Sequence, residues 1–445
     1  MKNLQFNKDI SRRGFVKGST LAASGIMATS GLGFASSVFA KGSDTLKLAV
    51  IGCGGRGTGA ANQALNADEG VKLVAMADAF KDRLDKCYST LSEKYDKKRL
   101  AVKDDAKFVG FNAYKEAIDM ADVVIIATPP GFRPEHFEYA VEKGKHIFAE
   151  KPMATDVPGI KRVLAAAKKA KEKKLNVVVG LQRHYQHNYR ELYKRLQDGQ
   201  MGDIIGGQVY WNGGGVWVRE RQAGQTEMEY QMRNWYYFNW LCGDHILEQH
   251  IHNIDVANWF VGELPVSAQG MGGREVRKGP DHGQIFDHHF VEFVYPSGAV
   301  ISSQCRHIRG CMNKVSEAFQ GTKGSVYSDG GGEGWMKKRD GSSIYEHDPS
   351  NDLTPYQVEH NEMFASIRSG GVINDAEYGA NSTMTAILGR MATYSGKLIT
   401  WEEAMASDMV LVPPSSEMSW DGKAPVSPDA DGNYPVPVPG QTEVL

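Results

Sequence analysis

The sequence predicts an α/β domain with an open parallel sheet, followed by an α+β domain built on a mostly antiparallel sheet. Two observations predict the first domain: apolar runs alternate with helical segments between residues 46 and 180, and turn or polar residues follow each run. Such alternation is typical of parallel sheets, which bind ligands at the carboxyl ends of their strands. The second domain is predicted because strand-like segments dominate from about Met201.

Length and composition describe a globular chain of more than one domain. Its 445 residues suffice for two or three domains with substantial cores. The net charge of −2, without a basic stripe, argues against a nucleic-acid partner. The five cysteines show neither metal-ligand spacing nor a dense disulfide framework. Cys305 and Cys311 either pair or remain free thiols.

The first 40 residues are interpreted as an export signal. Arg12 and Arg13 precede an Ala-, Ser- and Gly-rich run that ends at Val38-Phe39-Ala40. A charged start, a moderately apolar run and a small-residue ending are the parts of a secretory signal, and paired arginines resemble the twin-arginine type. We therefore expect a periplasmic mature protein without a membrane anchor; a disordered basic leader is the alternative.

The first strand and the turn after it predict a dinucleotide site. The apolar run 46–51 leads into Gly52-x-Gly54-x-x-Gly57, where glycines allow the backbone to approach a pyrophosphate at a helix N-terminus. A second apolar run ends at Asp78, about 20 residues further on, where a carboxylate can accept hydrogen bonds from an adenosine ribose. Ordinary turn glycines and an N-cap aspartate are the alternatives, but together the two features favour the dinucleotide site.

Three further strands complete the predicted parallel sheet. They are expected at 121–130, where two prolines halt a continuous apolar run, at 145–150 and at 176–180. Helices are expected between the strands at 58–67, 81–98, 135–142 and from Pro158 to about Lys174, the last with Asp156 as its N-cap. Four candidate site residues therefore lie at strand ends: Gly52, Asp78, Thr128 and Lys151.

The second domain is expected to contain strands and two late helices. The strands are predicted at 204–212, 264–270, 287–295 and 299–307, with a hairpin turn at Tyr295-Pro296-Ser297-Gly298. The helices are predicted at 356–369 and 379–395, and an extended tail rich in Pro, Ser, Asp and Gly follows Pro413. We divide the chain into a signal at 1–40, a dinucleotide domain at 41–175, a substrate and oligomerisation domain at 176–412 whose late helices return to the first domain, and a tail at 413–445.

Several motifs together carry a family resemblance. They are the glycine turn, Ala127-Thr128-Pro129, Glu150-Lys151-Pro152, residues 243–255 (GDHILEQHIHNID) and the closing stretch NSTMTAILGRMATYSGKLITW. From about Lys47 to Trp401 the chain resembles the Gfo/Idh/MocA family of sugar and cyclitol oxidoreductases, in its exported twin-arginine subgroup. The resemblance implies a Rossmann domain beside a large open-faced sheet, a sugar-like substrate between them, and a homodimer or homotetramer.

The resemblance also implies roles for single residues. Lys151 matches the lysine beside the nicotinamide, and His252 with Asp255 matches the family's His-x-x-Asp, whose histidine is the usual acid/base group. An imidazole can take the hydroxyl proton, and an ammonium can stabilise the alkoxide that develops. Glu248 replaces the common Asp; at i, i+4 it would share a helix face with His252 and orient the imidazole. The implied cofactor ligands are Gly52, Gly54, Arg56, Gly57, Asp78, Thr128, Pro129, Glu150 and Lys151.

The candidate substrate ligands are less specific. Arg183 and His184 follow a strand end and either reach the ligands or form an exposed loop, whereas Trp235 and Tyr236 either line the pocket or belong to the core. His250 and Asp255 complete the set. His245, Glu248 and His252 fall on roughly one helical face, but their spacing is not that of a zinc motif, so no metal is predicted. A further cluster, His282, His288 and His289, either borders the pocket or has a turn or sheet-surface role, and the second interpretation is favoured.

The predicted function is an NAD-dependent oxidoreductase acting on a hydroxyl of a sugar, cyclitol or sugar derivative. Asp78 would repel a 2′-phosphate, although nearby Lys81 leaves NADP open. Outside the cytoplasm nicotinamide cofactors are not freely supplied, so a tightly bound cofactor is expected. A redox-neutral NAD-dependent glycosidase or epimerase is the first alternative, because transient oxidation needs no second redox partner. A non-catalytic sugar-binding protein on the same fold is the second.

Overall fold

The computed structural model describes residues 45–445. The predicted export signal lies outside the described residues. Within them, no helix combines the length and apolar character needed to cross a membrane. All five cysteines are free, which decides between the alternatives for Cys305 and Cys311.

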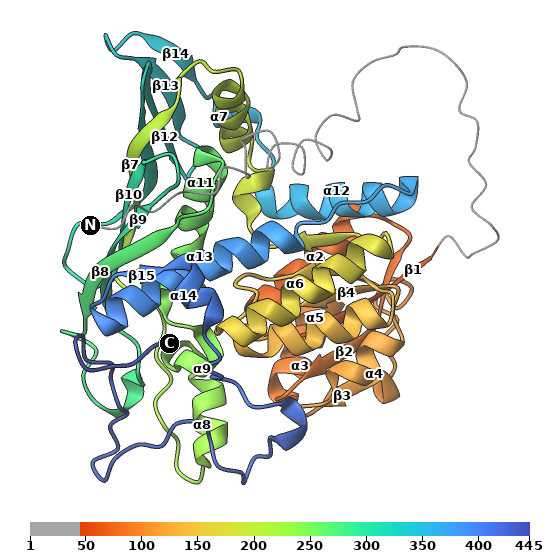
Figure 1. The fold of residues 1–445 in the computed structure, drawn as a ribbon. Helices are drawn as coiled ribbons and strands as arrows, with labels where there is room; N and C mark the ends of the chain where they lie inside the picture. Colours follow the sequence, from red (N-terminus) through yellow and green to blue (C-terminus); the bar gives the residue numbers. More distant parts are fainter. Residues whose placement is uncertain (1–44) are drawn as a thin grey trace, which may run out of the picture.

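The first domain is a six-stranded parallel sheet in the order β3-β2-β1-β4-β5-β6, as predicted for its fold class (Figure 1). Its strands are β1 (Leu46–Ile51), β2 (Val71–Asp78), β3 (Lys107–Val109), β4 (Val123–Ile126), β5 (His146–Ala149) and β6 (Val177–Val179). The central strands are buried along their whole length, which explains their continuous apolar sequence. Strand β6 belongs to this sheet although it lies beyond the domain boundary placed at residue 175.

Helices cover both faces of this sheet. They are α2 (Gly55–Ala67), α3 (Lys81–Ser92), α4 (Tyr114–Asp119), α5 (Arg133–Glu142) and α6 (Val157–Glu172). The Asp156 side chain accepts a hydrogen bond from the Gly159 N–H (2.8 Å), which confirms the predicted N-cap. Helix α3 ends at Ser92 rather than Lys98, and in the turn beyond it Asp96 accepts from the N–H groups of Lys98 and Arg99.

The second domain is a nine-stranded sheet in the order β14-β13-β12-β11-β7-β10-β9-β8-β15. The predicted strands are β7 (Ile204–Gly213), β8 (Ser267–Gly273), β9 (His288–Val294) and β10 (Val300–His307). All pairings are antiparallel except β7 with β10, so the sheet is mostly antiparallel, as predicted. The predicted hairpin turn closes with the Gly298 N–H donating to the Tyr295 carbonyl (2.9 Å).

Five strands of this sheet were not predicted: β11 (Lys314–Gly321), β12 (Gly324–Asp329), β13 (Gly334–Lys338), β14 (Ser343–Glu346) and β15 (Ile399–Thr400). Their buried positions include polar residues such as Ser316, Glu317 and Ser328, which hide the apolar alternation expected of a half-buried strand.

The second domain also contains helices, of which Figure 1 shows α11 (Ile251–Val261) and α13 (Ala376–Ser395) between its sheet and the first domain. The others are α7 (His187–Gln197), α8 (Glu227–Arg233), α9 (Asn239–Cys242), α10 (His245–Glu248), α12 (Pro355–Ser369) and α14 (Trp401–Ala406). Helix α12 packs on α2 and α13 packs on α6, so the late helices contact the first domain. Apolar residues of α6 join the cores of both domains, which fixes the domains against each other.

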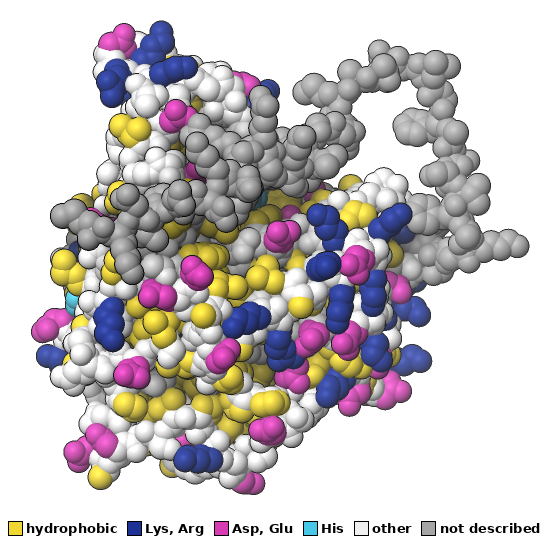
Figure 2. Space-filling model, in the orientation of Figure 1, with side chains coloured by type: hydrophobic (Ala, Val, Ile, Leu, Met, Phe, Trp, Pro, Cys, Tyr) yellow, Lys and Arg dark blue, Asp and Glu magenta, His cyan; other side chains and the backbone are white. Residues whose placement is uncertain are grey.

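The tail crosses from the first domain to the second. Trp420 packs on Phe80 and Phe111, with ring centroids 4.9 and 4.6 Å away, and the Tyr434 hydroxyl donates to Glu227 (2.5 Å) on α8. Figure 2 shows Lys and Arg interspersed with Asp and Glu over the first domain on the face drawn.

Candidate active site

A cleft of about 810 Å³ lies between the carboxyl ends of the parallel strands and the helices of the second domain. One half is lined by the glycine turn, Asp78 and the ends of β4 and β5. The other half is lined by residues of the second domain. The predicted strand-end residues Gly52, Asp78, Thr128 and Lys151 all line this one cleft.

The glycine turn is packed too tightly for side chains. Gly52 has φ of +91°, and a Cβ there would lie 2.6 Å from the backbone of Ala127 and Thr128. A Cβ at Gly57 would lie 1.9 Å from the Gly52 carbonyl oxygen. Helix α2 begins at Gly55, and its N-cap Gly54 makes no side-chain cap, so the N–H groups of its first turn are left for a ligand. This cradle fits a dinucleotide pyrophosphate.

Asp78 joins the end of β2 to this turn. Its carboxylate accepts from the Cys53 N–H (2.6 Å) and from the Phe80 N–H (2.8 Å), while burial raises its pKa. Phe80 and Phe111 line the cleft beside it. The carboxylate therefore lies where the ribose of a dinucleotide on the turn would end.

Thr128, Pro129, Arg56 and Glu150 complete the cofactor half. Thr128 and Pro129 line the cleft at the end of β4, next to the turn. Arg56 forms an ion pair with the buried Glu150 and a second with Glu359 (3.0 Å). Every residue predicted as a cofactor ligand therefore lines the cleft.

Lys151 and Glu248 form a partly buried ion pair inside the cleft. The Lys151 Nζ lies 3.2 Å from the Glu248 Oε1 and also donates to the Glu248 carbonyl, and their side chains are 12% and 13% exposed. Burial raises the pKa of Glu248, against the opposing effect of Lys151 and Arg133. The pair holds the ammonium of Lys151 at the junction of the two domains.

His252 lines the same cleft, on α11. Its Nδ1 is buried without a hydrogen-bond partner in the described chain and its ring stacks on Trp211 (5.9 Å between centroids), so Nε2 is the nitrogen available to the cleft. Burial lowers the pKa of His252, and Lys151 and Arg183 lower it further. The imidazole is therefore neutral and able to accept a proton.

The predicted Glu248–His252 helix pair is wrong. Helix α10 ends at Glu248 and α11 begins at Ile251, with a break at Gln249 and His250. The two residues therefore do not share a helix face, and the Glu248 carboxylate contacts Lys151 instead of the imidazole.

Among the candidate substrate ligands, Trp235 lines the cleft and the other five do not. Tyr236 is buried against Tyr237 and Trp235. His250 contacts the Ser303 hydroxyl on the sheet (2.7 Å).

A buried ion-pair network accounts for the remaining three. Arg183 pairs with Glu317 in the core. His184 contacts Asp255 (2.8 Å) and lies between the rings of Trp259 and Tyr378. The polar atoms of these side chains face the core instead of the cleft. Their contacts therefore hold elements of the second domain together.

Sequence reasoning missed several residues on the substrate side of the cleft. The lining residues that the sequence did not single out are Arg219, Gln249 and Tyr356, whereas Trp211 and Trp217, which also line the cleft, belong to the aromatic residues before the histidine motif, of which one or two were expected there. Gln249 had a usable signal, since it lies inside the motif between Glu248 and His252.

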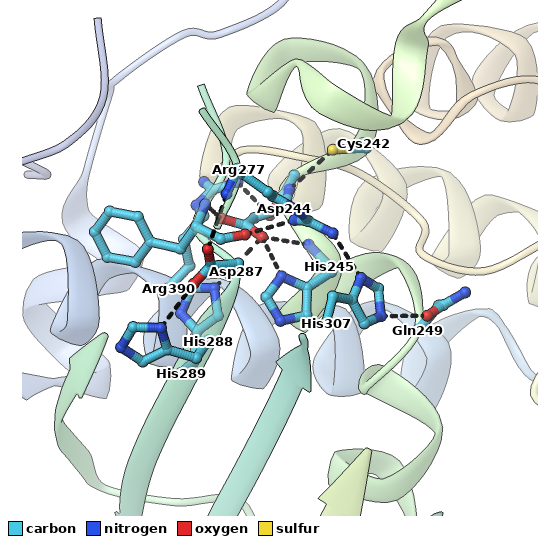
Figure 3. Close-up of polar contacts among 12 residues, drawn as sticks. Cys242, Asp244, His245, Gln249, Arg277, Asp287, His288, His289, His307 and Arg390 are labelled. Atoms are coloured by element: carbon cyan, nitrogen blue, oxygen red, sulfur yellow. Dashed lines mark hydrogen bonds and ion pairs between the residues drawn. The ribbon is translucent and has the colours of Figure 1, made fainter. Parts of the chain in front are cut away.

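A second polar cluster lies behind the cleft in the core of the second domain (Figure 3). Asp244, His245 and His289 are buried, so the predicted turn or sheet-surface role is wrong for His289. The possible metal-ligating atoms of the three residues lie within 4.8 Å of one another. The Asp244 carboxylate already accepts from the Tyr394 hydroxyl (2.6 Å) and the Phe286 N–H (2.9 Å). Although burial opposes ionisation, His289 and His245 hold the pKa of Asp244 well below its usual range. Hydrogen bonds within the chain therefore satisfy the Asp244 carboxylate, whereas the Nε2 atoms of His245 and His289 are buried without a hydrogen-bond partner among the described residues.

Comparison with known proteins finds relatives that are about a quarter identical to this chain over the aligned residues. An inositol 2-dehydrogenase of Rhizobium meliloti (strain 1021) is 25% identical over 287 residues, which are 64% of this chain and 76% of the relative. A 2,7-anhydro-N-acetylneuraminate hydratase of Escherichia coli (strain K12) is 26% identical over 213 residues, 47% of this chain and 52% of the relative. The chain thus spans about half of the second relative.

A solved structure shares the fold. A levoglucosan dehydrogenase in complex with NADH and levoglucosan has a TM-score of 0.62 and 18% identity, covering 80% of this chain and 99% of that one.

Two family models match successive parts of the chain. The oxidoreductase family with an NAD-binding Rossmann fold matches residues 46–179, up to the end of β6. The Gfo/Idh/MocA C-terminal domain matches residues 189–327, which include β7 to β11 and most of β12. Together the matches span more than half of the chain. The chain therefore belongs to the Gfo/Idh/MocA family of NAD-binding oxidoreductases.

Proposed function

We propose that this protein is an NAD-dependent oxidoreductase acting on a hydroxyl of a cyclitol, sugar or sugar derivative, with Lys151 and His252 at the site of hydride transfer. The observation that carries the proposal is that Lys151, paired with Glu248, and His252, whose pKa is lowered by burial, line one cleft together with the glycine turn. The inositol 2-dehydrogenase among its relatives supports the substrate class.

The residues suit alcohol oxidation. A nicotinamide cofactor held by the glycine turn, Asp78 and Thr128 would supply the hydride acceptor. The neutral His252 takes the hydroxyl proton at Nε2, and the Lys151 ammonium stabilises the alkoxide that develops on the substrate. Glu248 holds the ammonium in place through the 3.2 Å contact. In the reverse direction His252 returns the proton to the carbonyl oxygen.

The proposal favours NAD, held tightly. Asp78, at the end of β2, would repel the 2′-phosphate of NADP. Trp420 of the tail packs on Phe80 and Phe111, and this packing would restrain the end of the cleft where the adenine binds. Tight binding would let an exported enzyme keep its cofactor through turnover.

The proposal extends to location and assembly. The paired Arg12 and Arg13 favour twin-arginine export to the periplasm. The sheet face turned away from α11 and α13 carries a cross-strand row that includes Met271, which is 72% exposed, and Tyr210, and such a face suits a homodimer or homotetramer. Replacing both arginines by lysine should keep the protein in the cytoplasm; unchanged export would contradict this part. Light scattering tests the assembly, and a monomer at micromolar concentration would contradict it.

A redox-neutral reaction is the second candidate. The relative named as a hydratase of an anhydro sugar favours it. Oxidation of one hydroxyl would acidify the adjacent C–H, so that the substituent is eliminated and water adds to the resulting double bond. Re-reduction of the carbonyl to the hydroxyl would then return the cofactor to its starting state. Aryl glycosides and anhydro sugars incubated without added cofactor separate the candidates, because only the redox-neutral reaction yields product over many turnovers.

The test of the main proposal is a panel of cyclitols and aldoses with NAD⁺, followed at 340 nm. Lys151→Met and His252→Asn should each lower kcat by about 10²–10⁴-fold while the protein remains folded. Lys161→Met and His187→Asn, outside the cleft, are matched controls that should keep wild-type rates. Wild-type rates in the Lys151 and His252 variants would overturn the assignment.

A further inference from the structure

Gln249 occupies the break between α10 and α11 and lines the cleft between Glu248 and His252. Behind it, a chain of hydrogen bonds runs into the core (Figure 3). The Gln249 Oε1 lies 2.8 Å from the His307 Nε2, and the His307 Nδ1 lies 2.7 Å from an Arg277 guanidinium nitrogen.

The chemistry of these groups fixes the direction of both hydrogen bonds. A guanidinium only donates, so the His307 Nδ1 must accept and cannot carry a proton. The proton of the neutral ring is then on Nε2, which donates to the Gln249 Oε1. Burial lowers the pKa of His307, and His245 and Arg277 lower it further, so the ring stays neutral.

Arg277 is itself held rigidly. The Asp287 carboxylate accepts from the N–H groups of Glu275 (2.8 Å), Val276 (2.6 Å) and Arg277 (3.2 Å). The Arg277 guanidinium also donates to the Phe286 carbonyl (2.5 Å) and is buried. The donor that sets the His307 tautomer therefore cannot turn away.

The orientation of the Gln249 amide follows. Its oxygen is engaged by His307, so its Nε2 is on the other side, where it has no partner among the described residues. Gln249 thus presents two N–H donors to the cleft that also holds Lys151 and His252.

We propose that Gln249 is a specificity-determining residue that donates to an acceptor oxygen of the substrate, and that Arg277 and His307 are positioning residues that fix its amide. The proposal rests on the proposed function and narrows the substrate class. The substrate carries a hydroxyl or carboxylate oxygen at the position facing Gln249, and an ammonium group at that position is rejected.

The test compares Gln249→Met and Gln249→Glu on the best substrate of the panel and on its single-deoxy and amino-deoxy analogues. Gln249→Met should raise KM about tenfold, with kcat and NADH affinity near wild type, and should lose discrimination against one deoxy analogue. Gln249→Glu keeps an acceptor for His307 but presents an acceptor to the cleft, so it should favour an amino-deoxy analogue. Gln304→Met, on the outer face of β10, is the matched control and should leave KM unchanged.

The positioning role has its own test. The amide of His307→Gln can accept from Arg277 and donate to Gln249, so it should retain discrimination that His307→Leu loses. ¹⁵N NMR of the wild-type ring should show Nε2 protonated and Nδ1 unprotonated at neutral pH.

Wild-type KM in both Gln249 variants, or an Nδ1-protonated His307, would overturn the inference. Absence of turnover by the wild type on every substrate would instead count against the proposed function, and the NMR result would still decide the orientation of the amide.

Discussion

Replacing Trp420 by alanine separates cofactor retention from stability. Trp420 is partly buried and packs on two aromatic rings that line the cofactor half of the cleft. Each such pair contributes about 0.5–1.5 kcal/mol, so the two together contribute about 1–3 kcal/mol. If their loss loosens Phe80 and Phe111, the Kd for NADH should rise by about 5- to 150-fold.

The assay is titration of cofactor-free protein with NADH by fluorescence, beside thermal unfolding. Trp335→Ala is the matched control, because Trp335 stacks on Tyr327 in the outer sheet and does not line the cleft. It should lower Tm without changing the Kd. An unchanged Kd in Trp420→Ala, with only a lower Tm, would refute the role of the tail in holding the cofactor.

Three further predictions concern the turn, the histidine and the ribose carboxylate. Gly57→Ala should abolish measurable NADH binding, since its Cβ would meet the Gly52 carbonyl oxygen at 1.9 Å; binding within tenfold of wild type by titration would contradict this. Because burial lowers the pKa of His252 and oxidation needs the neutral ring, kcat/KM should fall with decreasing pH only below the ordinary histidine value of about 6.5, and an acid limb at or above that value would count against His252 as the base. Asp78→Ser should weaken the binding of NADH and reduce the preference for NADH over NADPH, measured as the ratio of the two Kd values. An unchanged ratio would contradict the role of Asp78 as a ligand of the ribose.

The cofactor half of the cleft could be predicted because its signals are local. Gly52 and Gly57 are required by backbone contacts of the turn itself, and Asp78 and Lys151 follow strands that their own apolar residues define. Parallel strands then bring these ends to one edge without any further information.

The substrate half could not be predicted as fully because long-range contacts decide which side chains face it. The sequence predicts Arg183 and Asp255 as ligands. In the structure Arg183 pairs with Glu317 and Asp255 contacts His184, both distant in the chain, so the two side chains lie in the core. The helix is interrupted at Gln249 and His250, between Glu248 and His252. The helical spacing of the motif's residues gives no sign of this interruption in the sequence.

The central claim is that Lys151 acts at the hydride-transfer site of a bound dinucleotide. Single-turnover absorbance at 340 nm tests it most directly, with protein saturated with NAD⁺ and mixed with its best substrate. We predict a transient in the wild type that slows by at least about 100-fold in Lys151→Met, while both proteins bind equal amounts of dinucleotide. Equal rates in the two proteins, or no dinucleotide bound by the wild type, would contradict the account.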